Sequence, residues 1–387
     1  MSKIVVGMSG GVDSAVAAYL LKEAGHEVIG VMLRTWSSTT EYEGEILDEP
    51  DEDTYVEQNK CCEIDDARAV CFKLGIPFYP FNCVKEFSDR VISPFVEAYI
   101  SGKTPNPCIE CNRYVKFEKL IHVADILKAD FVATGHYAKK VELPNGRLSV
   151  KRSDALKKDQ TYMLYKLSQD QLKKVIFPLG EFDKKKVREI AQKALLPVAD
   201  KKDSQEICFV PDDDYAGFIN RYCLNNKKHL YTDKDAAENS SYTIEKEGDF
   251  IDKAGNVLGR HKGIIHYTIG QRKGLGLSMG HPVYVCKLLS NENKVVIGEE
   301  EDLFSSSILI RDYNLMSIED IGKGERIRGI VKIRYHHAGE WAYIEKYDEE
   351  CLKLTFDKPV KSPTPGQSAV FYDEDGCVLG GGIISYR

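Results

Sequence analysis

KIVVGMSGGVDSAVAAYL, residues 3–20, is the stretch of sequence that decides the fold. Residues 3–8 are mostly apolar, as in a short buried strand, and the glycine-rich turn SGGVDS (9–14) follows them directly. Apolar residues then recur at helical spacing until Gly25: Val12, Ala15, Val16, Tyr19 and Leu20. The stretch therefore predicts a buried strand, a tight turn and a helix.

Further strands follow at intervals that leave room for helices. They are EVIGVML (27–33), IPFYPF (76–81) and DFVATGH (130–136). Strands that alternate with helices predict a parallel sheet covered on both faces, an α/β fold. Such sheets bind ligands beyond the carboxyl ends of their strands, where SGGVDS and ATGHY (133–137) both fall.

The pattern changes near residue 210. A polar, weakly helical stretch comes first, and from residue 242 short β-rich runs such as GIIHYTIG (263–270), SAVFY (368–372) and CVLGGGII (377–384) are separated by turn residues. These runs are typical of small β-barrels. We therefore expect a catalytic α/β domain over 1–210, a small central domain over 211–283 and a C-terminal β-barrel over 284–387.

Charge is unevenly distributed along the 387 residues. The net charge is −7, but residues 41–57 hold nine acidic residues and no basic one, and the rest of the chain has 53 positive against 51 negative residues. Residues 147–202 carry fifteen Lys and Arg against seven Asp and Glu. The charge is therefore compatible with a polyanionic partner, although each run could also be a solvated face.

Membrane spans and targeting segments have recognisable sequence patterns. No run approaches the roughly 18 apolar residues of a membrane span. The N-terminus MSKIVVGMSGG has neither the apolar core of a signal peptide nor the Arg-rich composition of a transit peptide. The sequence predicts a cytoplasmic protein with no membrane partner.

The turn GMSGGVDS (7–14) has the chemistry of a phosphate-binding loop. Its glycines let backbone N–H groups surround an anion, and the helix N-terminus adds the positive end of its dipole. The Lys that precedes Ser/Thr in a Walker A loop is missing, which favours attack at the α-phosphate of ATP over γ-phosphoryl transfer. Asp13 and Ser14 offer oxygens for Mg²⁺. The segment SGGVDS resembles the PP-loop of the ATP pyrophosphatases, which implies a Rossmann-like domain that forms adenylates.

Three of the eleven cysteines stand apart from the six singly placed, apolar ones and from the adjacent pair Cys61 and Cys62. Cys108 and Cys111 lie in TPNPCIECNRYVKF (104–117), and Cys208 lies in DSQEICFV (203–210). A helix N-terminus, Arg113 and Lys116 predict lowered thiol pKa values there. A lone CxxC is also compatible with a redox pair or half a zinc site, but the sequence has no second CxxC or HxxxH to complete the latter.

The motifs together resemble the tRNA-specific 2-thiouridylases, and the similarity runs nearly end to end. It is carried by PNPCIECN (105–112), ATGHYA (133–138), KKDQTYML (157–164), KKDSQEICF (201–209), TIGQRKGLG (268–276) and TPGQSAVFY (364–372). The resemblance implies ATP-dependent exchange of O2 for sulfur on the wobble uridine, position 34, in the tRNA anticodon loop. ATP with Mg²⁺ would adenylate O2, and pyrophosphate would leave.

The resemblance also assigns the catalytic cysteines. Cys208 would carry a persulfide from a sulfur-donor protein, such as a cysteine desulfurase or a relay protein. Its terminal sulfur would attack C2 directly or would first be released as hydrosulfide. Cys111 would be the nucleophile that cleaves the persulfide, leaving a Cys111–Cys208 disulfide. Some relatives have Asp in place of Cys108. An alternative route to the same product is a [4Fe–4S] cluster on Cys108, Cys111 and Cys208 that delivers sulfide.

Motif matching extends the resemblance to two sets of binding residues. The residues implied for ATP are Gly7, Met8, Ser9, Gly10, Gly11, Val12, Asp13, Ser14, Leu33 and Gly135. Those implied for the target base and the tRNA are Asn106, Pro107, Cys108, His136, Lys158, Asp159, Gln160, Arg334, Tyr335 and Gln367.

Two other functions remain open from the residues. A PP-loop ligase for small molecules would need a glutaminase domain or an amine site, and it would need no reactive cysteine. A non-catalytic RNA-binding protein would not need the unbroken SGGVDS or the two cysteine motifs.

Overall fold

The computed structural model describes residues 1–35, 61–202, 207–210, 212–226 and 246–385. The acidic run 41–57 lies outside these residues. Among the described helices, none is long and apolar enough to cross a membrane.

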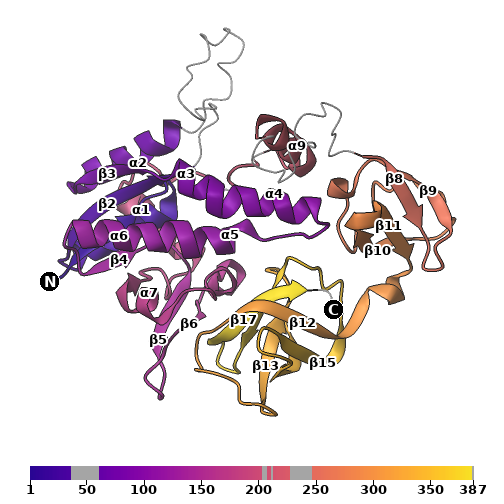
Figure 1. Cartoon of the computed structure of the whole chain (residues 1–387). Coiled ribbons are helices and arrows are strands. Elements are labelled where there is room, and N and C mark those ends of the chain that lie inside the picture. The colour runs from indigo at the N-terminus through magenta and orange to yellow at the C-terminus, as the bar shows by residue number, and fades with distance from the viewer. Residues whose placement is uncertain (36–60, 203–206, 211, 227–245, 386–387) are drawn as a thin grey trace, which may run out of the picture.

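The first domain is built on a five-stranded parallel sheet with the order β3-β2-β1-β4-β7. The strands are β1 (Lys3–Gly7), β2 (Glu27–Arg34), β3 (Phe78–Asn82), β4 (Phe131–Ala133) and β7 (Val175–Ile176). Helices cover both faces (Figure 1). The predicted Rossmann-like α/β class is confirmed.

Residues of β1 alternate between two hydrophobic cores. Ile4 and Val6 pack with α1 (Val12–Glu23), α2 (Cys61–Leu74) and α8 (Lys184–Lys193). Val5 points to the opposite face and packs with α6 (Glu118–Ile126). This alternation follows from the two-residue period of a strand, and it places the loop after β1 between the helices that cover the two faces of the sheet.

The cysteine motif begins a helix that continues into α6. Asn106 caps α5 (Pro107–Glu110), a π-helical segment (Cys111–Phe117) follows, and α6 continues from it. Such π-helical turns are rare in proteins overall, and many of those that occur lie at functional sites. A second helix of this kind consists of α3 (Val84–Phe87), a π-helical segment (Ser88–Ile92) and α4 (Ser93–Ile100).

The remaining elements of the first domain join it to the rest of the chain. The hairpin β5 (Ala138–Glu142) and β6 (Leu148–Arg152) precedes α7 (Gln169–Lys174). Helix α9 (Tyr215–Asn225) falls in the predicted central domain 211–283, but it packs through Phe218 and Ile219 into the first domain's core around Cys111.

The central sheet has the order β10-β11-β8-β9. Its strands are β8 (Gly248–Ile251), β9 (Val257–His261), β10 (Tyr284–Leu289) and β11 (Lys294–Gly298). Because β11 pairs with β8, residues 284–298 belong to this sheet and not to the barrel. The strand pairing therefore favours a division after β11 over the predicted one at residue 283.

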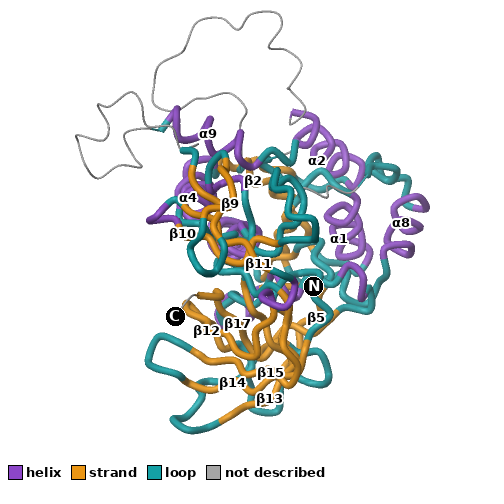
Figure 2. The backbone as a smooth tube through the Cα atoms, turned by 90° about the vertical axis from the view of Figure 1, so that its right-hand side faces the viewer, coloured by secondary structure: helices purple, strands orange, loops and turns teal. Residues whose placement is uncertain are grey.

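The last six strands close into a barrel, as predicted, with the order β12-β15-β14-β13-β16-β17. They are β12 (Phe304–Leu315), β13 (Arg326–Lys332), β14 (Glu340–Lys346), β15 (Leu352–Lys361), β16 (Ser368–Tyr372) and β17 (Val378–Ser385). Figure 2 shows the labelled barrel strands together in the lower part of the molecule, below helices α1, α2 and α8 of the first domain. Buried hydrogen bonds join the two domains, for example from Tyr162 Oη to Ser368 O at 2.8 Å.

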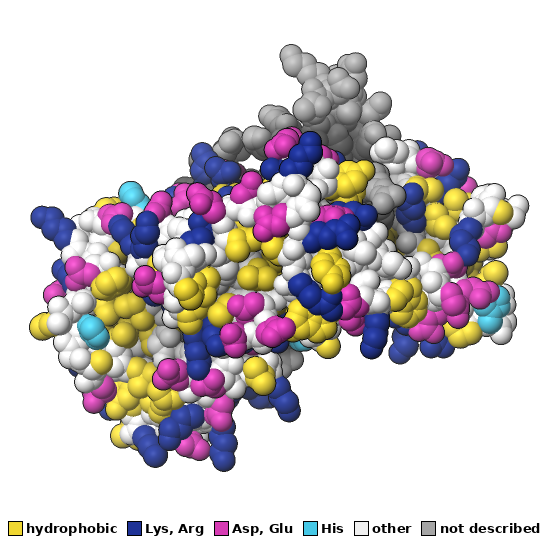
Figure 3. Space-filling view, turned by 90° about the horizontal axis from the view of Figure 1, so that it is seen from below, with side chains coloured by type: hydrophobic (Ala, Val, Ile, Leu, Met, Phe, Trp, Pro, Cys, Tyr) yellow, Lys and Arg dark blue, Asp and Glu magenta, His cyan; other side chains and the backbone are white. Residues whose placement is uncertain are grey.

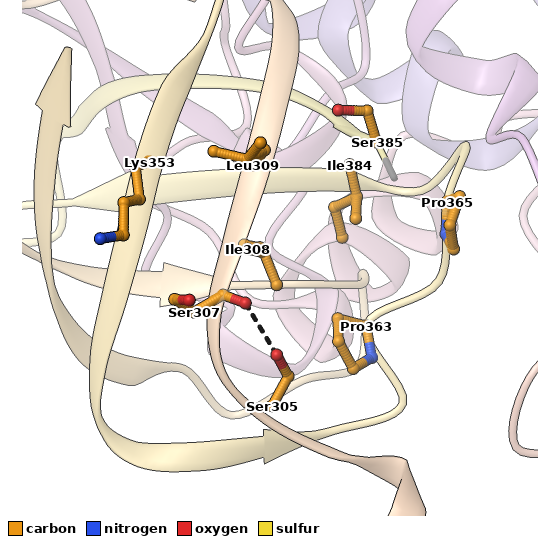
Figure 4. A pocket seen from close by; sticks show the side chains of 9 residues that line it. All are labelled: Ser305, Ser307, Ile308, Leu309, Lys353, Pro363, Pro365, Ile384 and Ser385. Atoms are coloured by element: carbon orange, nitrogen blue, oxygen red, sulfur yellow. Dashed lines mark hydrogen bonds between the residues drawn. The ribbon is translucent and has the colours of Figure 1, made fainter. Parts of the chain in front are cut away.

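A cavity of about 400 Å³ opens on the barrel, lined by residues that include Ser305, Ile308, Lys353 and Pro363 (Figure 4). None of the predicted site residues lines it. Figure 3 shows the face of the molecule seen from below, where Lys and Arg side chains alternate with Asp and Glu. That face therefore offers no uniformly basic patch to a polyanion.

Candidate active site

The loop after β1 has the shape of an anion cradle. Gly10 adopts φ +68°, and a Cβ there would lie 2.5 Å from the carbonyl oxygen of Glu63, so only glycine fits. Ser9 N donates to Ser14 Oγ, and Ser14 Oγ donates to Gly11 O, each at 3.1 Å. These bonds turn the loop into the N-terminus of α1, where a phosphate is favoured.

Gly135 joins the end of β4 to this loop. A Cβ on Gly135 would lie 2.7 Å from backbone atoms of Asp13 and Ser14, so the two segments touch through their main chains. Leu33 lies near the end of the neighbouring strand β2, and Met8 N donates to Val31 O of that strand at 2.7 Å. The residues predicted for ATP thus meet at one edge of the sheet.

Asp13 has two polar partners that its sequence motif does not reveal. Tyr137 Oη donates to Asp13 Oδ1 at 2.7 Å, and Lys184 Nζ lies 2.8 and 2.9 Å from the two carboxylate oxygens. On the other side of the loop, Lys201 Nζ donates to Gly10 O at 3.1 Å and pairs with Asp66 at 2.6 Å. The sequence signal for Lys184 is the basic composition of 147–202, whereas Lys201 also begins the motif KKDSQEICF (201–209).

The three cysteines of the predicted site differ in access. Cys111 is buried, whereas Cys108 and Cys208 are exposed. Asn106 Oδ1 accepts a hydrogen bond from Cys108 N at 3.2 Å, which fixes the start of the helix that carries both Cys108 and Cys111. Cys208 is therefore accessible from solvent, while Cys111 is enclosed.

Burial raises the pKa of Cys111 to about 12, and Lys116 lowers it less than burial raises it. The pKa of Cys108 is raised in the same way, because protein atoms replace much of the water near its thiol even though the residue keeps an exposed surface. The prediction of lowered thiol pKa values is therefore wrong in direction. Of the two cations expected, Arg113 instead lies over the Tyr114 ring at 4.7 Å.

Lys116 is the charge that connects the three cysteines. Its own burial disfavours the ammonium, but the neighbouring Cys111, Cys108 and Cys208 raise the lysine's pKa overall. All three thiols are therefore within electrostatic reach of one cation. A thiolate formed at Cys111 would have Lys116 as its counter-ion.

A cluster of metal ligands was the alternative use of these cysteines. Within the described ranges, no group of three or more His, Cys, Asp or Glu side chains is arranged to hold a metal ion. The described positions of Cys108, Cys111 and Cys208 therefore give no support to a three-thiolate site.

His136 is 9% exposed and lies among aromatic rings. Its Nδ1 is 2.8 Å from Thr134 Oγ1, and its ring centroid is 5.6 Å from that of Phe117 and 6.4 Å from that of Phe177. Burial, with Lys116 nearby, lowers the pKa of His136 to about 3. The imidazole is therefore neutral at physiological pH.

This burial predicts a pH-dependent stability. Unfolded His136 takes up a proton near pH 6.5, whereas the folded side chain does not until about pH 3. The contribution of His136 to the free energy of unfolding is therefore fully present above pH 6.5 and is lost as the pH is lowered toward 3. Between pH 7 and pH 5, the free energy of unfolding measured in urea should fall by about 2 kcal/mol less for His136→Phe than for the wild type. The phenylalanine keeps an aromatic ring beside Phe117 and Phe177. An equal decrease in both proteins would contradict the assignment.

The residues predicted to contact tRNA divide into buried and accessible ones. Asp159 is buried and accepts a hydrogen bond from Thr161 Oγ1 at 2.7 Å, and Gln160 Oε1 accepts one from Tyr137 N at 3.0 Å. Gln367 Nε2 donates to Thr104 O at 2.8 Å, which ties the barrel to the loop before the cysteine motif. These three side chains hold protein segments together.

The barrel residues come close to the cysteines. Tyr335 packs against Tyr162 with ring centroids 6.1 Å apart, and its pKa is raised by burial, by Asp159 and by Cys108. Arg334 is within electrostatic reach of Tyr162. The structure thus brings Arg334 and Tyr335 to the side of the cysteine site that Cys108 occupies, while Lys158 lies in the 3₁₀ turn Leu156–Lys158.

Comparisons with known proteins cover nearly the whole chain. A family model described as the tRNA methyl transferase HUP domain matches residues 2–212. A tRNA methyl transferase PRC-barrel domain matches 240–299, and an aminomethyltransferase beta-barrel domain matches 305–384.

Individual relatives are similar over their full length. The tRNA-specific 2-thiouridylase MnmA of Lachnoclostridium phytofermentans is 47% identical over 389 residues, which cover 99% of each chain. The protein of that name from Clostridium acetobutylicum is 46% identical over 386 residues, again 99% of each chain.

Solved structures are more distant. The U34-tRNA thiolase NcsA from Methanococcus maripaludis, with its [4Fe–4S] cluster, is 21% identical over 59% of this chain and 67% of its own, with a TM-score of 0.33. That likeness is too slight to bear on function. The full-length identities confirm the resemblance seen in the motifs, and the chain belongs to the tRNA-specific 2-thiouridylase family.

Proposed function

We propose that the protein is an ATP-dependent tRNA sulfurtransferase that converts the wobble uridine at position 34 to 2-thiouridine. One observation carries the proposal: the consecutive residues Gly135 and His136 face the two halves of the site. Gly135 touches the phosphate-binding loop, and His136 lies within electrostatic reach of Lys116, which stands among the three thiols. Activation and sulfur transfer can therefore act on one base. The name and full-length similarity of the relatives support the same substrate.

The first half-reaction is adenylation. Uridine O2 attacks the α-phosphorus of ATP, pyrophosphate leaves, and C2 acquires AMP as a leaving group. The backbone N–H groups of Gly10 and Gly11 and the N-terminus of α1 bind the phosphates. Asp13 and Ser14 have oxygen atoms suited to Mg²⁺, which supplies positive charge to the phosphates when bound. The target uridine must leave the base stack to reach this site.

The second half-reaction transfers sulfur. A donor protein loads Cys208 as a persulfide, whose terminal sulfur attacks C2 and displaces AMP. The Cys111 thiolate then attacks the Cys208 sulfur, which releases 2-thiouridine and leaves a Cys111–Cys208 disulfide. A thiol reductant returns both cysteines to the reduced state. Lys116 offsets part of the cost of the buried Cys111 thiolate.

Methyl transfer, named in two family descriptions, is the second candidate function. It needs neither a pyrophosphate-binding loop nor a pair of thiols around a lysine. The site geometry therefore favours thiolation.

The test supplies purified protein with ATP, Mg²⁺, a persulfide source and unmodified tRNA, followed by mass spectrometry of the nucleosides. We expect 2-thiouridine at position 34 and one pyrophosphate per modified tRNA. No 2-thiouridine after both aerobic and anaerobic reconstitution would overturn the proposal. Product only after anaerobic reconstitution with iron and sulfide would replace the persulfide route with the cluster route.

A further inference from the structure

Helix α8 brings a lysine to a phosphate-binding loop that lacks one. Lys184 is the first residue of α8, and the Asp183 cap accepts a hydrogen bond from Lys186 N at 2.7 Å. Val187 and Ala191 on the next turns are buried in the core that also contains Val12 and Ala15 of α1. The position of Lys184 relative to the loop is therefore fixed by packing and capping.

The ammonium of Lys184 is directed at the loop. Its Nζ lies 2.8 and 2.9 Å from the two oxygens of Asp13, which also accepts a hydrogen bond from Tyr137. The Lys184 side chain is 17% exposed and that of Asp13 is 33% exposed. Asp13 sits in the first turn of α1, beside the N–H groups that would bind phosphate. A cation held there is next to the incoming polyphosphate.

The charge balance of the loop gives the reason for this lysine. The polyphosphate of ATP adds several negative charges beside the Asp13 carboxylate. A Walker A loop offsets such charge with its own lysine, and GMSGGVDS has none. An ammonium has three protons, so Lys184 can bond to Asp13 and to a phosphate oxygen together.

We propose that Lys184 binds the phosphates of ATP and takes the place of the lysine that the loop lacks. This inference rests on the proposed function, because it assumes that the loop binds ATP. The Lys184 ammonium acts as a fixed positive charge that stabilises bound ATP and the departing pyrophosphate, and it transfers no proton. Lys184 belongs to the basic segment 147–202, whose charge is compatible with a polyanionic partner, but in this role it binds ATP and not RNA.

Equilibrium binding of ATP, adenosine and unmodified tRNA to Lys184→Met tests the proposal, with Lys185→Met as the matched control. Lys185 is the next residue of the same helix, is exposed, and carries the same charge. We expect Lys184→Met to weaken ATP binding about 10- to 100-fold, the effect of one charge-assisted hydrogen bond. Adenosine and tRNA binding should be unchanged, and Lys185→Met should match the wild type.

Each other outcome overturns the inference in a different way. Equal ATP affinity in the wild type and Lys184→Met would show that the lysine only neutralises Asp13. Weaker tRNA binding with unchanged ATP binding would make it an RNA contact. An equal loss of adenosine binding would mean that it shapes the whole pocket. A wild-type protein that binds no ATP would instead refute the proposed function.

A second comparison guards against damage from an unpaired Asp13. Asp13→Asn is compared with the double variant Asp13→Asn/Lys184→Met, in which no carboxylate is left without its cation. If Lys184 binds phosphate, the double variant binds ATP about 10-fold or more weakly than Asp13→Asn alone. Equal affinities would overturn the proposal.

Discussion

Cys111→Ser and Cys208→Ser are each expected to lower 2-thiouridine formation at least about a thousandfold, because each removes a sulfur that changes bonds in the proposed reaction. Pyrophosphate release in the presence of tRNA should persist in both variants, since neither cysteine belongs to the phosphate-binding loop. Mass spectrometry of nucleosides and a pyrophosphate assay measure the two half-reactions separately.

The two variants should differ in what they accumulate. Without Cys111, the sulfur already bonded to C2 stays linked to Cys208, so a disulfide-linked protein–tRNA adduct should appear on a non-reducing gel. Without Cys208, no adduct should form. Cys351→Ser, a buried cysteine of the barrel, is the matched control and should behave like the wild type. Loss of pyrophosphate release in Cys208→Ser would make Cys208 structural, and equal loss of thiolation in Cys108→Ser would favour the cluster route.

The parts of the fold that local sequence could predict are those governed by local rules. The loop after β1 was predictable because Gly10 must adopt a positive φ, and strand, turn and helix adjoin in sequence. The β-rich composition predicted the C-terminal barrel. The strand pairing favours a domain division after β11, and not at the predicted residue 283, because β8 pairs with β11. No short-range sequence pattern reveals this parallel partner.

The electrostatics of the site could not be predicted from spacing. Lys116 follows Cys111 closely, which suggested a low thiol pKa, but burial by segments distant in sequence outweighs the lysine. Residues such as Phe95 and Phe209 enclose that region, and their contribution depends on tertiary packing. The contact from Lys184 to Asp13 spans 171 residues and has no motif of its own.

Lys166 makes a further long-range contact, which joins the cysteine helix to the barrel. Its side chain is 2% exposed, and Nζ lies 2.6 Å from Glu110 Oε1 and 2.5 Å from Asp312 Oδ2. Glu110 directly precedes Cys111, and Asp312 lies in β12. Burial disfavours the ammonium, but Tyr165 and the two carboxylates raise the pKa of Lys166 overall, so the lysine stays charged.

Lys166→Met is expected to lower the free energy of unfolding by about 2–4 kcal/mol, because it removes the cation from a largely buried ion network and leaves Glu110 at 23% exposure without a partner. The exposed Asp312 adds little to that cost. Thiolation should also fall, since the helix start that carries Cys111 is no longer anchored to the barrel. Urea unfolding and the nucleoside assay measure the two effects.

Lys173→Met is the matched control, since Lys173 lies seven residues further on and pairs with Asp170 at 2.9 Å on the surface. It should leave the free energy of unfolding close to that of the wild type, because exposed ion pairs contribute little to stability. Adding Glu110→Gln to Lys166→Met removes the unpaired charge, so part of the stability should return while thiolation stays low. Recovery of both would mean that the network acts on Cys111 only through stability. Equal stabilities of Lys166→Met and Lys173→Met would refute the role of the buried lysine, because a cation that holds two domains together cannot be replaced without cost.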